Sequence, residues 1–323
     1  MKDFLLSLEF QARNGVKLGS SVRLSQPKKI QKILFCGMGG SAIGGDIIRE
    51  AGFSSSKIPF FVHRASTIPS WVDQNTLVIL SSYSGNTQEV LDACKKAAAR
   101  KPQFLILTSG GQLAEIAKKK KISHAIVPSG MPPRGAVGYM TFPLLVALKT
   151  NKFAEIGQSE IEETLRMLGK SPASEAAAIA RKLSGKSVHF YAVTGPMQVV
   201  VSRWRAQLAE NSKMLASGFL MPEMFHNEIE GWRFPKSVIK DSAAVFFLDE
   251  DDPAWIEKKR KAVMTLIENQ GGSCLALSSR GKSILARIFS MIQLGDWVSY
   301  ELANLQGIDP IAIPAIESIK KIH

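Results

Sequence analysis

The sequence predicts an α/β protein with two domains, each a parallel β-sheet flanked by helices. The chain has 323 residues, which is enough for two domains of ordinary size. Short apolar runs alternate along it with helix-like segments, and such alternation favours parallel sheets that are covered on both faces. Apolar residues make up 45% of the chain and charged residues 21%, which is typical of a folded soluble protein.

In the first half, each expected strand ends in a turn rich in Gly, Ser or Asp and leads to a helical stretch. The expected strands cover residues 33–36, 77–80, 104–107 and 125–127. Helices are expected over 88–100 and from the turn after the third strand to residue 121. Because open parallel sheets bind ligands beyond the carboxyl ends of their strands, the turns after these strands are candidate binding loops.

The second half repeats this theme with similar spacing, which suggests a duplicated α/β domain. Its expected strands cover residues 188–193, 243–248 and 274–277, and its expected helices cover 196 to about 215, 253–269 and 282–306. The sequence therefore predicts an N-terminal domain over 1–155, followed by a linker helix and a C-terminal domain over 156–323. The Ala- and Glu-rich segment 159–183 is the expected helical linker.

The most informative turn is Ser-Ser-Tyr-Ser-Gly-Asn-Thr, residues 81–87, which lies between an apolar strand and a helix start. The first N–H groups of a helix have no internal partner, and the helix dipole is positive at that end. The hydroxyls of Ser82, Ser84 and Thr87 add to this, so the turn is suited to an anion such as a phosphate. No lysine lies in the loop, which excludes a nucleotide-binding P-loop.

A second turn, Gly-Met-Gly-Gly-Ser-Ala-Ile-Gly-Gly-Asp over residues 37–46, follows the first strand. Glycines let backbone N–H groups approach a ligand closely. The dinucleotide fingerprint is disfavoured, because the expected acidic residue is missing from Phe-Phe-Val-His-Arg at 60–64. The second half has no comparable loop, and its acidic run 249–252 would repel phosphate. One phosphate site is expected, in the first domain.

Arg134 is a candidate for binding an anion or a developing oxyanion. Two prolines, Pro132 and Pro133, precede it and restrict the loop that carries it. A guanidinium on a stiff loop suits this chemistry. An ordinary surface arginine fits the same pattern equally well, so both interpretations stay open at this point.

Glu210 and His226 are candidates for proton transfer. Glu210 lies in a segment with helical spacing, where the pattern by itself favours an exposed carboxylate paired with a nearby base. His226 lies in an irregular segment of polar and aromatic residues over 222–232, which is typical of a functional loop. Histidine titrates near neutral pH and can relay protons.

Composition argues against several other classes of protein. The three cysteines and five histidines show no metal-ligand spacing, so no metal is expected, and free thiols fit a reducing cytoplasm. Asp3 and Glu9 interrupt the early apolar stretch, so no secretory signal is expected, and no apolar run is long enough to span a bilayer.

The net charge is +13. Without a nucleic-acid-binding motif, the basic runs 118–121 and 258–261 are interpreted as solvated surface.

Taken in order, the segments GMGGSAIGGD, SSYSGNT, PPRGAVGY, AENSK and HNEIEGW resemble the bifunctional phosphoglucose/phosphomannose isomerases. SYSGNT with the glycine-rich turn resembles the sugar isomerase (SIS) domain, which binds phosphosugars. The resemblance extends over about residues 30–321. It implies two flavodoxin-like SIS domains per subunit, a homodimer with a shared active site, and a hexose 6-phosphate substrate. No cofactor, metal, nucleic acid or membrane is implied.

The resemblance also implies a role for each motif residue. Ser82, Ser84 and Thr87 would hold the 6-phosphate, helped by the backbone around Gly40 and Ser41. Glu210 matches the catalytic base. His226 matches the ring-opening histidine that the other subunit contributes. Arg134 matches the arginine beside the enediolate, and Lys320 matches the C-terminal lysine, with Lys321 as the alternative register.

The resemblance implies interconversion of glucose 6-phosphate and fructose 6-phosphate through a cis-enediol. In the family, tolerance of mannose 6-phosphate is attributed to a threonine near the C-terminal lysine, but no threonine follows Thr265 here. The glucose activity is therefore the firmer expectation. The alternatives are another SIS-domain phosphosugar isomerase and a non-catalytic phosphosugar sensor. A sensor would normally carry a DNA-binding module, and about 30 residues before the first strand are too few for one.

Overall fold

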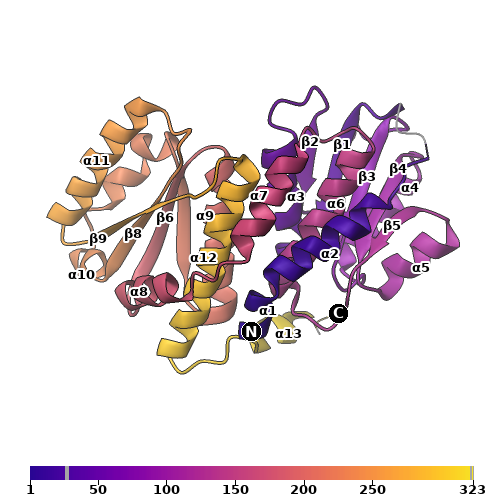
Figure 1. The fold of residues 1–323 in the computed structure, drawn as a ribbon. Helices are drawn as coiled ribbons and strands as arrows, with labels where there is room; N and C mark the ends of the chain where they lie inside the picture. The colour runs from indigo at the N-terminus through magenta and orange to yellow at the C-terminus, as the bar shows by residue number, and fades with distance from the viewer. Residues whose placement is uncertain (26–28, 321, 323) are drawn as a thin grey trace. The chain divides into compact units, whose positions relative to one another are not determined.

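Contacts between residues divide the chain into two compact units, and each is built around its own sheet. The N-terminal unit comprises Leu6–Gly169, and the C-terminal unit comprises Lys170–His323 together with Met1–Leu5. The structure, a computed structural model, describes residues 1–25, 29–320 and 322. Figure 1 shows each sheet with its flanking helices. All strand pairs are parallel, so the predicted fold class is confirmed.

The sheet of the N-terminal unit has the strand order β2-β1-β3-β4-β5. This is the flavodoxin-like order, in which the chain moves to one side of β1 and then continues on the other side. The strands are β1 (Lys32–Gly37), β2 (Phe60–His63), β3 (Thr76–Ser81), β4 (Gln103–Thr108) and β5 (Ser123–Ile126). Both central strands are buried along nearly their whole length, as expected for a sheet covered on both faces.

Helices cover both faces of this sheet (Figure 1). They are α2 (Leu8–Ser20), α3 (Gly39–Gly52), α4 (Gln88–Ala98), α5 (Gly111–Lys119), α6 (Val137–Thr150) and α7 (Gln158–Leu168). On one face, Leu34 and Leu80 share a buried cluster with residues of α4 and α5. On the other face, Phe35 packs against α3, where a Cβ added to Gly45 would lie 2.6 Å from the ring. The sheet is therefore the middle of three layers.

The C-terminal unit contains a four-stranded sheet with the order β7-β6-β8-β9. Its strands are β6 (Ser187–Val193), β7 (Ala216–Met221), β8 (Ser242–Leu248) and β9 (Ser273–Ser278). Its helices are α8 (Ala173–Leu183), α9 (Pro196–Gln207), α10 (Lys236–Lys240), α11 (Ala254–Asn269), α12 (Ile284–Leu305) and α13 (Pro314–Lys320), and α1 (Lys2–Leu6) belongs to it up to Leu5. The order matches that of β2-β1-β3-β4 in the N-terminal unit.

Aromatic side chains fill both faces of the second sheet. On one face, Tyr191 and Phe246 stack with ring centroids 5.1 Å apart, in a buried cluster that includes residues of α11. On the other face, Phe190 stacks on Phe247, and Trp204 of α9 lies 5.0 Å from Phe247. The alternation of side chains along β6 and β8 therefore sets two separate apolar layers.

One expectation about this unit is wrong. The helix expected to run to about residue 215 is α-helical only to Gln207 and continues as a π-helical turn, η3 (Leu208–Ser212). Strand β7 then follows, where the sequence indicated no strand. Its first residues, Ala-Ser-Gly, have low strand propensity, and the strand exists because it pairs with β6 over residues 188–193.

The expected linker 159–183 is two helices separated at residues 169–172. Helix α7 packs against α2 of the N-terminal unit, and α8 packs against α12 of the C-terminal unit. Contacts thus divide the chain between Gly169 and Lys170. The domain boundary near residue 155 stays a prediction.

Within the described ranges, no helix is both long and apolar enough to cross a membrane.

A buried ion pair joins α9 to α12 in the C-terminal unit. Arg203 donates to both carboxylate oxygens of Asp296, with Nε to Oδ1 at 2.9 Å and Nη2 to Oδ2 at 2.7 Å. Gln207 Nε2 donates to the same Oδ1 at 2.8 Å. The two charged side chains are only 3% and 4% exposed. Such a pair is costly to disrupt, because removing one partner leaves the other charge buried and uncompensated.

We expect Asp296→Ala to lower the free energy of unfolding by about 3–5 kcal/mol, because Arg203 would keep a buried charge without its partner. Urea unfolding followed by circular dichroism would measure this. Glu257→Ala is the control, since Glu257 forms an exposed ion pair with Lys261 on α11 and its loss should change stability far less. Equal effects of the two substitutions would contradict the importance of the buried pair.

Candidate active site

The carboxyl ends of β1 and β3 place two candidate loops side by side. The strands are neighbours, and Gly37 is in register with Ser81 at their last residues. Helix α3 begins directly after β1 at Gly39, and α4 begins after the β3 loop at Gln88. Two helix N-termini, each the positive end of a dipole, therefore occur at one edge of the sheet. This edge is the switch point at which open α/β sheets bind ligands.

The loop after β3 is organised around its own hydroxyl groups. The oxygens of Ser82 and Thr87 lie 2.7 Å apart, and Ser82 Oγ also accepts a hydrogen bond from Gly85 N at 3.1 Å. Ser84 is exposed, and its Oγ accepts from Asn86 N at 3.3 Å. Ser82 is buried and thus shapes the loop, while Ser84 and the half-buried Thr87 present their hydroxyls at the start of α4. The arrangement suits an oxyanion.

The glycine-rich loop after β1 is bonded to the β3 loop. Ser41 Oγ accepts a hydrogen bond from Tyr83 N at 3.1 Å, and Ser41 itself is buried. Gly39 has φ +46°, a left-handed conformation that glycine adopts without strain. The two loops therefore form one structure rather than two independent turns.

Glycine is also required where the loops after β3 and β4 meet. A Cβ at Gly85, which has φ +71°, would lie 1.9 Å from Gly110 O. A Cβ at Gly111 would lie 2.4 Å from Ser84 O. Asn86 Oδ1 completes the contact by accepting a hydrogen bond from Gln112 N in the first turn of α5. This close approach leaves little freedom for the hydroxyl-rich loop to change conformation.

Arg134 is brought to the same edge. It lies in the 3₁₀ turn η2 (Pro133–Gly135) and is only 2% exposed, which removes the interpretation as a surface arginine. A Cβ at Gly40 would lie 3.2 Å from Arg134 N, so the glycine-rich loop and the Arg134 loop are in close contact. The backbone of a buried arginine thus lies beside the first turn of α3.

Tyr83 connects the loop that carries Arg134 to the loops after β1 and β3. No role for Tyr83 was predicted from the sequence. Its hydroxyl donates to Pro128 O at 2.9 Å and accepts from Met131 N at 3.0 Å. Its side chain is buried, and burial raises the pKa of the phenol. The neutral hydroxyl can therefore act as donor and acceptor at once. Tyrosine between two serines was the available signal, but its partners lie about 45 residues away in the chain.

An ion pair occupies the position where a dinucleotide site would need a free acidic residue after β2. Arg64 follows β2 and binds the buried Asp46 of α3, with Arg49 3.8 Å from the same carboxylate. Burial raises the pKa of Asp46, and the two arginines oppose this. The pair fixes the body of α3, whose first turn carries Gly40 and Ser41.

Glu210 lies in the π-helical turn η3 and is half-buried. The residue spacing of an α-helix, used to assign its neighbours from sequence, does not hold in this turn. Asn211 Nδ2 donates to Ser299 Oγ at 2.9 Å, and Ser212 Oγ donates to Ser299 O at 3.0 Å, so the turn is anchored on α12. π-Helical turns are rare and occur often at functional sites.

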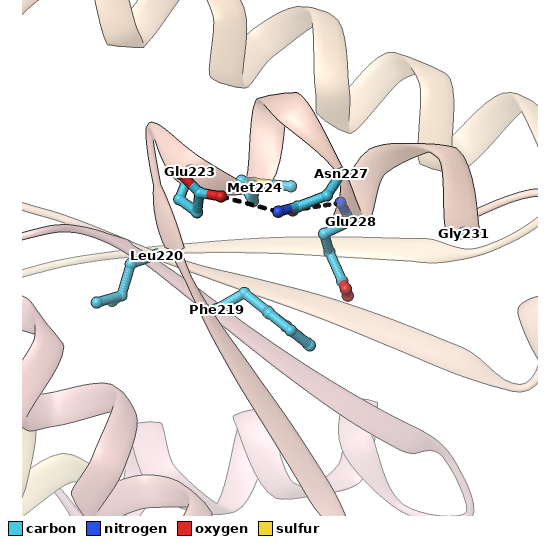
Figure 2. A pocket seen from close by; sticks show the side chains of 7 residues that line it. All are labelled: Phe219, Leu220, Glu223, Met224, Asn227, Glu228 and Gly231. Atoms are coloured by element: carbon cyan, nitrogen blue, oxygen red, sulfur yellow. Dashed lines mark hydrogen bonds between the residues drawn. The ribbon is translucent and has the colours of Figure 1, made fainter.

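His226 is the exposed last residue of the 3₁₀ turn η4 (Glu223–His226), which follows β7. A pocket of about 400 Å³ lies beside this turn, and Figure 2 shows its lining side chains. The lining residues are Phe219, Leu220, Glu223, Met224, Asn227, Glu228 and Gly231. His226 is not among them.

Tyr191 of β6 forms hydrogen bonds with the segment that carries His226. Tyr191 OH donates to Glu228 Oε1 at 3.1 Å and accepts from Trp232 Nε1 at 2.9 Å. Asn227 Nδ2 donates to Glu223 Oε1 at 3.0 Å across the turn, as Figure 2 shows. Burial raises the pKa of Glu228, while the bond from Tyr191 opposes this. The turn is thus fixed on both sides of an exposed histidine.

Lys320 is the last residue of α13 and is exposed. Lys321, the alternative, lies outside the described residues. The predicted site residues therefore form two groups. Gly40, Ser41, Ser82, Ser84, Thr87 and Arg134 meet at one edge of the N-terminal unit, and Glu210, His226 and Lys320 belong to the C-terminal unit. Among residues 1–25, 29–320 and 322, no three His, Cys, Asp or Glu side chains are grouped to hold a metal ion.

Two family models match the chain. Residues 27–136 match the SIS domain, and residues 173–322 match the bacterial phospho-glucose isomerase C-terminal SIS domain. The matches thus cover the hydroxyl-rich loop and Arg134 in one unit, and Glu210 and His226 in the other.

Relatives extend the likeness over nearly the whole chain. A bifunctional phosphoglucose/phosphomannose isomerase of Caldicellulosiruptor bescii is 34% identical, with 99% of this chain and 98% of the relative covered. A protein of the same description from Aquifex aeolicus is 36% identical over 90% and 89% of the two chains. Among solved structures, a hypothetical protein of Thermus thermophilus shares the fold, with a TM-score of 0.73, 17% identity and coverage of 98% and 88%.

We expect Tyr83→Phe to lower the free energy of unfolding by about 1–3 kcal/mol, because Met131 N–H would lose its buried acceptor. Urea unfolding would measure the loss, and hydrogen exchange should show faster exchange of the Met131 amide. The control is Tyr300→Phe, since the ring of Tyr300 contacts Trp297 and no hydrogen bond of its hydroxyl is found in the described structure. An unchanged Met131 exchange rate would show that the phenol does not hold the loop.

Proposed function

The chain belongs to the bifunctional phosphoglucose/phosphomannose isomerase family, and we propose that it interconverts glucose 6-phosphate, fructose 6-phosphate and mannose 6-phosphate. The observation that carries this proposal is the edge at β1 and β3, where hydroxyls, two helix N-termini and a buried arginine meet. This edge provides the chemistry for a phosphosugar, and the family defines the reaction.

The phosphate-binding role falls to the N-terminal unit. Ser84 and Thr87 present hydroxyls at the first turn of α4, and the buried Ser82 holds their loop in shape. Gly40 and Ser41 lie in the first turn of α3 and bring the positive end of that helix to the same edge. Binding the 6-phosphate here orients the distant C1 and C2 atoms, so that remote binding energy contributes to catalysis.

The proton transfer falls to Glu210. In the open-chain aldose, its carboxylate removes the C2 proton while O1 gains a proton, which gives a cis-enediol. Return of the proton to C1, with loss of the proton from O2, then gives the ketose. The guanidinium of Arg134 stabilises the negative charge that develops on the sugar oxygens. Glucose and mannose 6-phosphates give the same enediol, because they differ only in configuration at C2.

Opening of the sugar ring needs proton transfer at the ring oxygen and at O1. We assign this to His226 and Lys320. His226 is exposed at the end of η4 and thus accessible to a second molecule. The proposed arrangement is a homodimer in which His226 of the partner subunit completes each site.

Apolar exposure around β7 supports the dimer. Leu215 precedes this strand and is 92% exposed, and Phe219 within it is 39% exposed. Both lie between Glu210 and His226 in the chain, and exposed apolar side chains beside a functional site are typical of an interface.

The free thiols fit a cytoplasmic location, and burial raises the pKa of Cys36 to about 12, which leaves that thiol unreactive.

The decisive test is a coupled assay that follows the conversion of fructose 6-phosphate and of mannose 6-phosphate, with EDTA present. We expect both conversions in the wild-type protein and a loss of about 10²- to 10⁴-fold in kcat for Glu210→Gln, because the amide cannot take up the proton. Phosphosugar binding should persist in this variant, measured by calorimetry. Near-normal turnover of Glu210→Gln would remove Glu210 as the base.

The same assay separates the alternatives. A pentose or aminosugar phosphate converted in place of both hexose phosphates would indicate another SIS isomerase. Binding of a phosphosugar and retention on DNA, without turnover, would indicate a sensor. His226→Ala should slow turnover of the cyclic substrate under conditions where ring opening limits the rate, and an unchanged rate there would refute its assignment.

The phosphate-binding loop makes a separate prediction. Ser84→Ala and Thr87→Ala should each raise KM for fructose 6-phosphate by about tenfold or more, because a hydrogen bond to a charged group contributes about 1.5–3 kcal/mol. The effect on kcat should be smaller. Ser20→Ala is the control, since its exposed hydroxyl donates to the carbonyl of Val16 in its own helix. A KM unchanged in both loop variants would argue against this phosphate site.

A further inference from the structure

The ammonium group of Lys213 connects two separate segments of the C-terminal unit. Lys213 follows the π-helical turn that carries Glu210, and its Nζ donates to Glu210 O at 2.9 Å and to Asn211 O at 3.2 Å. The same Nζ donates to Asp309 O at 2.8 Å. Asp309 lies shortly before α13, the helix that ends in Lys320. One side chain thus contacts the turn that carries Glu210 and the segment that leads to Lys320, two of the three proposed proton-transfer groups of this unit.

This geometry matches what a lysine at a helix end can do. The last carbonyls of a helix have no partner within it and form the negative end of the dipole, where a cation is favourable. An ammonium group has three N–H donors, and here three carbonyl oxygens lie within hydrogen-bond distance. Two of them belong to the η3 turn, and the third belongs to a segment that is 96 residues away in sequence.

The backbone at Lys213 shows that this placement has a cost. Lys213 has φ +56°, in the left-handed region, where a residue with a side chain is disfavoured by about 1–2 kcal/mol. The turn after residue 309 is fixed as well, because Asp309 Oδ1 accepts a hydrogen bond from Ile311 N at 2.7 Å. A strained residue that reaches a fixed turn can hold two segments in one arrangement.

We propose that Lys213 is a positioning residue that sets Glu210 relative to the segment 309–320. The inference rests on the proposed function. The buried Asn211 and Ser212 attach the η3 turn to Ser299 of α12. The exposed Lys213 attaches the same turn to Asp309 O. Without this contact, the η3 turn stays folded, but Glu210 loses its fixed position. Since a displacement of about 1 Å can cost about 10²-fold in rate, the effect should appear in kcat.

The test is Lys213→Met, which keeps an unbranched side chain only one atom shorter but removes its donors. We expect kcat for fructose 6-phosphate to fall about 10- to 100-fold, with KM changed less than about threefold, because the phosphate-binding loop lies in the other unit. Lys213→Arg should recover part of the loss. Hydrogen exchange over residues 309–320 should become faster in Lys213→Met and not in Lys213→Arg.

Lys101→Met is the matched control. Lys101 also follows a helix, is exposed and has φ +56°, so both substitutions place methionine in the same backbone conformation. Its kinetic constants should equal those of the wild-type protein. Lys213→Asn is a second variant that tolerates left-handed backbone but cannot reach Asp309 O, and we expect the same loss of kcat without a loss of thermal stability.

The outcomes distinguish this inference from the proposed function. An inactive wild-type protein would overturn the proposed function. An active wild-type protein with unchanged kcat in Lys213→Met and Lys213→Asn would overturn only the role of Lys213. A loss that is equal in Lys213→Met and Lys101→Met would also overturn it, because the effect would then come from the backbone conformation.

Discussion

The parallel pairing of β1 with β3 is the constraint on which the N-terminal site depends. Because the strands are neighbours and end in register at Gly37 and Ser81, the loops after them must lie side by side. The reversal of strand order at this point leaves room for a ligand beyond their ends. The Tyr83 hydroxyl, which donates to Pro128 O and accepts from Met131 N, then fixes the loop that carries Arg134. The site is therefore a result of the topology first and of side chains second.

The second sheet repeats the strand order, but its equivalent edge carries ion pairs. The loop after β8 carries Asp249, whose carboxylate accepts hydrogen bonds from Arg287 Nε at 3.1 Å and Ser279 Oγ at 2.8 Å. Arg287 is also paired with Glu250 and Asp251. Internal ion pairs thus occupy the edge that corresponds to the proposed phosphate site of the N-terminal unit. Glu210 and His226, the residues proposed for proton transfer, lie instead in the turns before and after β7.

Much of this was accessible from the sequence, and the failures have identifiable physical causes. Apolar runs followed by glycine and hydroxyl residues predicted the parallel sheets and the loop 81–87, because both depend on local pattern. Strand β7 was missed, since Ala-Ser-Gly is a poor strand former and the strand exists only through pairing with β6. The π-helical turn at Glu210 has the residue pattern of an α-helix. The role of Tyr83 depends on partners far away in the chain.

The close approach of the loops after β3 and β4 limits how this site can be engineered. Gly85 and Gly111 each sit where any side chain would collide with the backbone of the other loop, and Asn86 caps the helix that follows the second loop. The two loops therefore form one structural module. A design that transplants the hydroxyl-rich loop into another α/β scaffold has to carry residues 108–112 with it.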